Sequence, residues 1–148
     1  MDKYDVLKLE NQLCFSLYAL SREVIKMYKP LLDPFDLTYT QYVTMMVMWE
    51  QEQITFKELG NRLYLDSGTL TPVLKKLESK GIVRKYRSKE DDRVVIVEIT
   101  DSGRELKDKI IEVPENILCR FSGEEENLLS LKMQLDELLR KGLNKDCT

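Results

Sequence analysis

The sequence predicts a mainly α-helical fold with one small β-hairpin. Through most of the 148 residues, apolar side chains recur at spacings of three and four, which is the pattern of amphipathic helices. Residues 82–99 differ, because they carry two β-branched runs separated by a polar stretch. The elements follow the order helix, helix, helix-turn-helix, hairpin, helix, helix. This order predicts a winged helix-turn-helix with further helices at both ends.

The first two helices are expected on either side of a proline-containing break. Leucines and other apolar residues at helical spacing predict a helix over residues 6–29, which Pro30 is expected to end. Thr38 and Gln41 then have the spacing of a capping box, in which the Thr side chain caps the helix and Gln41 reaches back to its start. The apolar stretch 42–49 is the body of this second helix.

Two short helices joined by a tight turn come next and predict a helix-turn-helix. Thr55 and Glu58 form a second capping box that opens a helix to about Leu63. Ser67 is the expected N-cap of the following helix, which stops at Gly81, a residue type common just past a helix end.

The hairpin that follows is expected to form a charged wing. Residues 82–87 and 94–99 are strand-like, and residues 88–93 are a polar turn. From residue 75 to residue 93 there are eight basic and four acidic side chains, a net charge of +4 in a chain of net charge −3. A basic segment on an acidic body is an electrostatic footprint for nucleic acid, although a solvated charged face is the simpler alternative.

The C-terminal part is expected to be helical and to pair with a second copy. A long helix is predicted from about Gly103 to Arg120, with a bend at Pro114. Ser122 and Glu125 form a third capping box that opens a leucine-rich last helix. The terminal helices have strongly apolar faces, and packing against another copy would bury them.

We therefore expect a single domain over residues 1–148 with two regions. The helical dimerisation region is expected to span about residues 1–37 and 101–148. The DNA-binding winged helix-turn-helix is expected to span about residues 38–100. A homodimer predicts a pseudo-palindromic operator with half-sites about 34 Å apart.

Composition limits the chemistry. The chain has no histidine, which removes His-based acid–base catalysis and His-containing metal sites. Cys14, Cys119 and Cys147 are too far apart for a CxxC zinc site, and free thiols in a reducing compartment are expected. No apolar run approaches the ~20 residues of a membrane span, and the charged N-terminus is unlike a signal peptide. We expect a cytoplasmic protein that is not an enzyme and uses no cofactor.

Four stretches of the sequence resemble the MarR family of dimeric winged-helix transcriptional regulators, and in particular its organic-hydroperoxide-sensing branch. They are LENQLCFSLYALSRE, YKPLLDPFDLTYTQY, LYLDSGTLTPVLKKLESKG and RSKEDDRVVIVEIT. The last two stretches are specific for the wider family. The first, with its cysteine, and the tyrosines after it are specific for the branch. The resemblance implies a repressor.

A recognition helix enters the major groove with its first residues nearest the base edges. The candidate DNA-binding residues on the helix and the wing are Ser67, Gly68, Thr69, Thr71, Lys75, Lys76, Arg87, Asp91 and Arg93. The resemblance implies that Arg93 enters the minor groove, and Asp91 is placed to hold its guanidinium. For Ser67, Thr69 and Thr71, simple helix capping is the alternative.

Cys14 is the candidate sensor, placed in mid-helix on the apolar face. Tyr18 lies one turn on, about 6 Å along the helix, whereas Tyr28 lies about 21 Å away and must come from a partner helix to join the same site. The resemblance implies that these tyrosines serve a reactive cysteine and that Tyr39 lies near it. The alternatives are an inert core thiol and ordinary packing of each tyrosine.

The expected chemistry is attack of the Cys14 thiolate on an organic hydroperoxide to give a sulfenic acid, followed by release of DNA. An apolar pocket is expected beside the thiol and would favour organic hydroperoxides over hydrogen peroxide. Its expected residues are Phe15, Leu17, Met45 and Met46. The branch contains members with one cysteine and members with a late second cysteine, and Cys119 matches the second type. Cys147 and a small thiol are the alternative partners of Cys14.

Three competing functions stay open from the sequence. The first is a MarR-type regulator that binds a small aromatic ligand while Cys14 is structural. The second is a thiol peroxidase, although the sequence lacks a thioredoxin-like βαβ frame and an Arg next to Cys14. The third is a purely structural helical dimer, which the basic wing disfavours.

Overall fold

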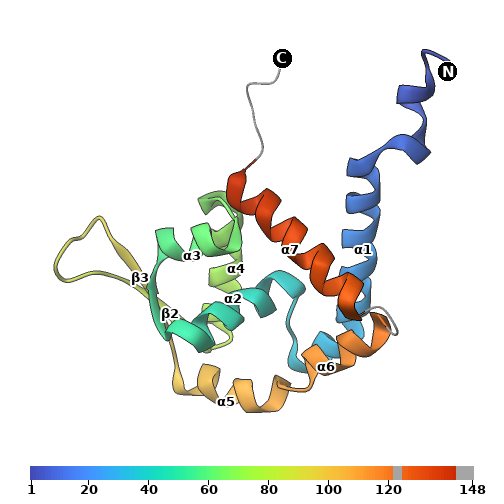
Figure 1. Cartoon of the computed structure of the whole chain (residues 1–148). Coiled ribbons are helices and arrows are strands. Elements are labelled where there is room, and N and C mark those ends of the chain that lie inside the picture. The colour runs from blue at the N-terminus through green and yellow to red at the C-terminus, as the bar shows by residue number, and fades with distance from the viewer. Residues whose placement is uncertain (122–124, 143–148) are drawn as a thin grey trace. The chain divides into compact units, whose positions relative to one another are not determined.

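The computed structural model describes residues 1–121 and 125–142. The chain forms two compact units, Met1–Val113 and Pro114–Thr148. Figure 1 shows a mainly helical chain with a small twisted sheet, which confirms the predicted fold class. Among the described residues, no helix is both long and apolar enough to cross a membrane.

The first long helix, α1 (Leu13–Leu32), is shifted toward the C-terminus relative to the prediction. Two 3₁₀ turns, Asp5–Leu7 and Leu9–Asn11, precede it because the Gln12 side chain donates to the carbonyls of Val6 and Lys8 at 2.7 and 2.9 Å. The prediction that the helix ends at Pro30 is wrong. Pro30 lies inside the last turn, and the helix continues to Leu32 because the bonds after Pro30 still form: Asp33 N donates to Lys29 O.

The second helix, α2 (Tyr39–Gln51), starts at the predicted capping box. Thr38 Oγ1 accepts from Gln41 N at 3.3 Å, and Gln41 Oε1 accepts from Thr38 N at 3.2 Å. The predicted box therefore forms in full, and it fixes the direction in which α2 enters the core.

The predicted helix-turn-helix is made of α3 (Phe56–Leu63) and α4 (Ser67–Ser79). Thr55 caps α3, because its side chain accepts from Glu58 N at 3.1 Å, but this is the one half of the predicted capping box among the described hydrogen bonds. The N-cap of α4 is Asp66 and not Ser67, which is the first helical residue. Aspartate is as good an N-cap as serine, and its charge also suits the positive end of the helix.

The sheet has three antiparallel strands in the order β1–β3–β2. The expected hairpin is β2 (Val83–Arg87) and β3 (Val95–Ile99). The additional strand, β1 (Gln53–Thr55), pairs with β3 and places Ile54 opposite Val97. The sequence analysis missed β1 because three residues are too few to show a strand period, and only pairing with β3 orders them.

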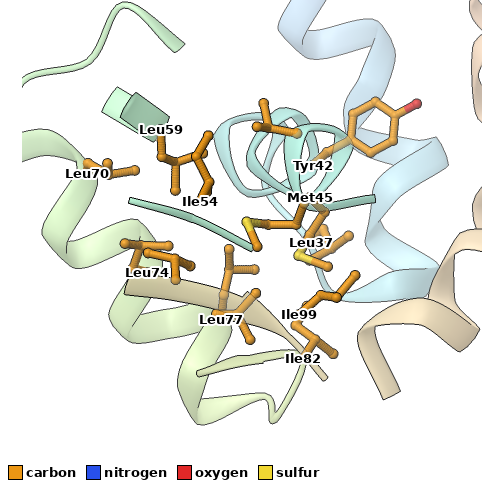
Figure 2. Close-up of a cluster of buried hydrophobic side chains, with 14 of the residues drawn as sticks. Leu37, Tyr42, Met45, Ile54, Leu59, Leu70, Leu74, Leu77, Ile82 and Ile99 are labelled. Atoms are coloured by element: carbon orange, nitrogen blue, oxygen red, sulfur yellow. The ribbon is translucent and has the colours of Figure 1, made fainter. Parts of the chain in front are cut away.

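The core lies between α2, α3, α4 and the inner face of the sheet. Figure 2 shows apolar side chains from these elements converging on one cluster. Ten of the cluster's residues are labelled there: Leu37, Tyr42, Met45, Ile54, Leu59, Leu70, Leu74, Leu77, Ile82 and Ile99. Burial of this cluster holds α4 against α2 and against the base of the wing.

The helix predicted over residues 103–120 is divided in the structure. It consists of α5 (Asp101–Ile110), α6 (Val113–Leu118) and a 3₁₀ turn at Cys119–Phe121. Pro114 therefore does not bend one helix, because it occupies the first turn of a new one, where its missing N–H has no helical acceptor to lose. The last helix is α7 (Glu125–Lys141), and the capping box predicted at Ser122 lies outside the described residues.

The start of α5 packs directly on the base of the wing. A Cβ at Gly103 would lie 2.3 Å from Ile82 O and 2.7 Å from Ile99 Cγ1, so only glycine fits there. Thr100 N donates to Ile82 O at 3.1 Å, and Thr100 Oγ1 donates to Gly81 O at 2.6 Å. These contacts tie both wing strands to α5.

We expect Gly103→Ala to lower the free energy of unfolding by about 1 to 3 kcal/mol, because the added methyl group forces the backbone of α5 away from Ile82. Urea unfolding at fixed protein concentration measures this loss. Gly68→Ala is the control. An added Cβ at Gly68 meets only Asp66 Oδ1 at 3.4 Å, so this variant should be as stable as the wild type or up to about 1 kcal/mol more stable. Equal stability of the Gly103 variant and the wild type would contradict the close packing.

Candidate DNA interface and thiol site

One face of α4 is buried and the opposite face is free. Leu70, Leu74 and Leu77 lie fully buried in the core. The residues predicted to contact DNA from this helix are all exposed: Ser67, Gly68, Thr69, Thr71, Lys75 and Lys76. The helix is therefore anchored along one side while hydroxyls, an accessible glycine backbone and two ammonium groups project from the other. A recognition helix needs this arrangement to enter a major groove.

The first turn of α4 is ordered by Asp66. Its Oδ1 accepts from Thr69 N at 2.8 Å, and Thr71 Oγ1 donates to Ser67 O at 2.7 Å. Hydrogen bonds from Thr69, first from its backbone and then from its side chain, hold the pKa of the Asp66 carboxyl below its ordinary value. Asp66 thus orients the neighbouring residues, and it takes the capping role that the sequence had assigned to Ser67.

The wing tip presents one arginine held by one aspartate. Arg93 Nε and Nη2 donate to the two carboxylate oxygens of Asp91 at 3.1 and 3.2 Å, and Arg93 N donates to Oδ1 at 3.0 Å. The side chain of Arg93 is nonetheless 90% exposed. The guanidinium hydrogen bonds, followed by the backbone one, hold the pKa of Asp91 below its ordinary value. The predicted contact between the two residues is present, and it fixes an exposed cation in one orientation.

The other arginines of the hairpin are engaged with the protein. Arg87 Nη1 donates to Asp92 O at 2.7 Å and so braces the loop that carries Arg93. Arg84 pairs across the sheet with Glu98 at 3.2 Å, and this contact raises the pKa of the Arg84 guanidinium. The net charge counted along the sequence therefore overstates the charge that this segment offers to a ligand. The side chain of Arg93 is 90% exposed, against 65% for that of Arg84.

Cys14 lies at the second position of α1 and is exposed. The expectation that it sits in mid-helix was wrong, because the 3₁₀ turns before α1 delay the start of the helix. A thiol that is exposed in the single chain is not an inert core residue of that chain. Tyr18, one turn on, is 57% exposed, and the Arg22 guanidinium lies over its ring at 5.5 Å.

Tyr28 and Tyr39 meet within one chain. Their ring centroids lie 4.7 Å apart, and each ring also approaches Tyr42, at 5.8 and 6.5 Å. Burial raises the pKa of all three phenols, that of Tyr42 to about 12. They are therefore neutral at physiological pH and can donate hydrogen bonds. The sequence analysis did not select Tyr42 for this cluster, although its spacing of three from Tyr39 is a signal for it.

The structure places Cys14 and the Tyr28–Tyr39 pair apart in one chain. Because α1 is continuous between positions 14 and 28, the helical rise separates them by about 21 Å. Near Cys14, α1 exposes several apolar side chains: Leu13, Leu17 and Leu20 on one face and Phe15 on another.

The apolar pocket guessed from the sequence is not assembled within the chain. Met45 is 0% exposed and belongs to the central cluster, whereas Phe15, Leu17 and Met46 are 42%, 39% and 40% exposed. The predicted pocket was wrong because it grouped residues from two helices by their hydrophobicity alone. Helical packing turns Met45 inward and leaves the α1 residues facing outward.

The second compact unit contains Cys119, which is exposed in the 3₁₀ turn after α6. It lines a cavity of about 630 Å³ between this turn and α7, together with apolar residues that include Leu118, Phe121 and Leu129. Cys147, the other late cysteine, lies outside the described residues. On α7 itself, Leu129, Met133 and Leu138 are exposed, so this helix also carries uncovered apolar side chains.

Comparison with known proteins is consistent with these features. A family model described as "Transcriptional regulator SarA/Rot" matches residues 26–110. The chain is 49% identical to an organic hydroperoxide resistance transcriptional regulator of Bacillus subtilis, over 93% of this chain and 94% of that protein. It is 40% identical to the regulator SarZ of Staphylococcus saprophyticus, over 90% and 91% of the two chains.

Solved structures of regulators share the fold. One described as reduced AbfR bound to DNA aligns with a TM-score of 0.73 and 34% identity, covering 90% of this chain and 97% of that one. Another, of MarR, aligns with a TM-score of 0.72 and 27% identity, over 88% and 98% of the chains. The exposed face of α4, the wing and the likeness over nearly the whole length all point to the same family. The chain belongs to the MarR family of winged-helix transcriptional regulators, in the branch of the organic hydroperoxide resistance regulators.

Proposed function

We propose that two copies of this chain form a homodimeric, cytoplasmic repressor that binds operator DNA, senses organic hydroperoxides by oxidation of Cys14 and then releases the DNA. The observation that carries the proposal is the exposed Cys14 thiol at the start of an apolar α1, in a chain 49% identical to an organic hydroperoxide resistance regulator. Structures of AbfR described as reduced, overoxidized and disulfide-formed add that a relative with this fold is redox-active.

DNA would be read by α4 and by the wing. The exposed residues of the first turn, Ser67, Gly68, Thr69 and Thr71, face the base edges, and Lys75 and Lys76 neutralise phosphates. Arg93, held by Asp91, enters the minor groove, while Arg87 keeps the wing loop in shape. Two such units in a dimer bind half-sites about one helical turn, or roughly 34 Å, apart.

The sensor site would be built from two protomers. Because about 21 Å of helix separates Cys14 from Tyr28 in one chain, an antiparallel second copy of α1 is needed to bring them together. Tyr28 and Tyr39 of that copy then approach Cys14 as one pair, since their rings already lie 4.7 Å apart. Tyr18 completes the site from the same helix as Cys14. Residues 1–37 and 101–148 form the dimerisation region, around the winged helix-turn-helix of residues 38–100.

The chemistry is a two-electron oxidation of sulfur. The Cys14 thiolate attacks the terminal, hydroxyl oxygen of the hydroperoxide, an S–O bond forms, the O–O bond breaks and the alkoxide leaves to take up a proton. The product is a sulfenic acid. Attack by a second thiol then gives a disulfide and water, and we propose Cys119 of the second protomer as that thiol. Its exposure and its apolar surroundings in the cavity below α7 suit a buried contact in the dimer.

We expect Arg93→Ala to weaken operator binding by about tenfold or more, because a contact worth about 1 to 3 kcal/mol is lost at each wing. The plot of log Kd against log salt should also become shallower, by about 1 for each wing. A salt titration by fluorescence anisotropy measures both effects. Lys109→Ala removes an exposed charge from α5 and serves as the control. Unchanged binding by the Arg93 variant would show that the wing does not reach DNA.

We expect Cys14→Ser to bind the operator like the reduced wild type but to keep it in the presence of cumene hydroperoxide, since a hydroxyl does not react with peroxides under these conditions. A gel-shift assay with hydroperoxide and then reductant tests this. The small-aromatic-ligand alternative predicts the opposite result, in which the serine variant still releases DNA.

We expect the oxidised wild type to run as a crosslinked dimer on a non-reducing gel and Cys119→Ser to run as a monomer, because the second thiol of the disulfide is missing. Reduction with dithiothreitol should restore the monomer band of the wild type. A crosslinked dimer that persists in the Cys119 variant would exclude Cys119 and point to Cys147.

A further inference from the structure

An aromatic row runs along α2, starting from the phenols already described. Tyr39 and Tyr42 lie on the same side of the helix, Tyr28 of α1 packs against both, and the Trp49 ring lies 6.4 Å from that of Tyr42, edge-on. The row therefore continues from the Tyr28–Tyr39 pair to the far end of α2 through ring contacts. Tyr42 is 1% exposed, so water does not separate these rings at its centre.

The end of this row is tied to α5. Trp49 Nε1 donates to Gly103 O at 2.8 Å, a hydrogen bond between residues 54 positions apart. Indole nitrogen is a donor only, so this carbonyl fixes the orientation of the ring. Gly103 is the residue that touches the backbone of Ile82 and leaves no room for a Cβ.

The same position of α5 holds the base of the wing. Ile82 leads into β2 and Ile99 ends β3, and both are in contact with Gly103. Thr100 closes this corner by bonding to the carbonyls of Gly81 and Ile82. Because the packing is this close, there is no void that could absorb a shift of Gly103 by a few tenths of an ångström. Such a shift therefore moves β2 and β3, which hold the loop that carries Arg93.

We propose that Tyr42 and Trp49 are positioning residues that couple the sensor phenols to the wing. The inference rests on the proposed function, in which oxidation of Cys14 disturbs Tyr28 and Tyr39. Rearrangement of these two rings displaces Tyr42, which displaces Trp49, and the bond from Trp49 to Gly103 O passes the shift to the base of β2 and β3. All the residues of this row lie in one compact unit, so the coupling needs no change in how the two units are placed.

Trp49→Phe tests the coupling. The variant keeps an aromatic ring against Tyr42 but removes the donor to Gly103 O. We measure the operator Kd of each protein before and after stoichiometric cumene hydroperoxide, and we follow sulfenic acid formation at Cys14 by dimedone labelling. The ratio of oxidised to reduced Kd should fall by roughly 2- to 30-fold relative to the wild type. The labelling rate should be unchanged, since the variant leaves the thiol and the phenols intact.

Glu50→Gln is the matched control, because it removes the ion pair between Glu50 of α2 and Arg62 of α3 next to the aromatic row. Its Kd ratio should equal that of the wild type. If Trp49→Phe has the same ratio of oxidised to reduced Kd as the wild type, the inference is overturned. A wild type that keeps its DNA after oxidation overturns the proposed function instead.

A second measurement needs no substitution in the row. Trp49 is the one tryptophan of the sequence, so its fluorescence emission reports on this position alone. Oxidation of the DNA-free wild type should shift or quench the emission, and Cys14→Ser should abolish this change. If oxidation releases the DNA while the emission stays constant, the row does not carry the signal, and the inference is wrong even though the sensor works.

Discussion

The buried face of α4 is the constraint on which the DNA-binding surface depends. Leu70, Leu74 and Leu77 are each fully buried, and burying a leucine stabilises a fold by about 1.5 to 3 kcal/mol. This packing sets the rotation of α4 about its axis and therefore decides which side chains face outward. Asp66 fixes the start of the same helix, so the exposed hydroxyls of the first turn are held in place from both directions. A rigid support of this kind allows small, weakly bonding side chains to serve in recognition.

The length of α1 imposes a second constraint, and it concerns the proposed sensor site. A continuous helix separates Cys14 from Tyr28 by about 21 Å, whereas tertiary packing brings Tyr28 to Tyr39 at 4.7 Å. One chain therefore supplies a thiol at one place and a pair of neutral phenols at another. The exposed apolar residues of α1 favour burial against a second copy, which would solve both problems with one interface. In the proposed mechanism, sensing and dimerisation depend on the same interface.

Charge on the wing is arranged more selectively than its total suggests. Arg84 is paired with Glu98, and Arg87 is bonded to the backbone of the wing loop. Arg93 is also paired, with Asp91, but its side chain is 90% exposed. An oriented and accessible guanidinium loses less freedom on binding than a mobile one, which improves its contribution to affinity. The net charge of −3 on the whole chain limits attraction to other polyanions.

Local signals in the sequence determined α2, α3 and α4, the capping box at Thr38 and the two wing strands, because hydrogen bonding and side-chain periodicity over a few residues are enough to specify them. They did not give the bounds of α1 or the division between α5 and α6. Only the tertiary structure decided the features that depend on distant partners. Strand β1 exists because β3 lies beside it, Met45 is buried because α2 packs on its neighbours, and the rings of Tyr28 and Tyr42 meet because two helices cross. No sequence period records such contacts, since each joins residues whose separation along the chain has no fixed relation to their distance in space.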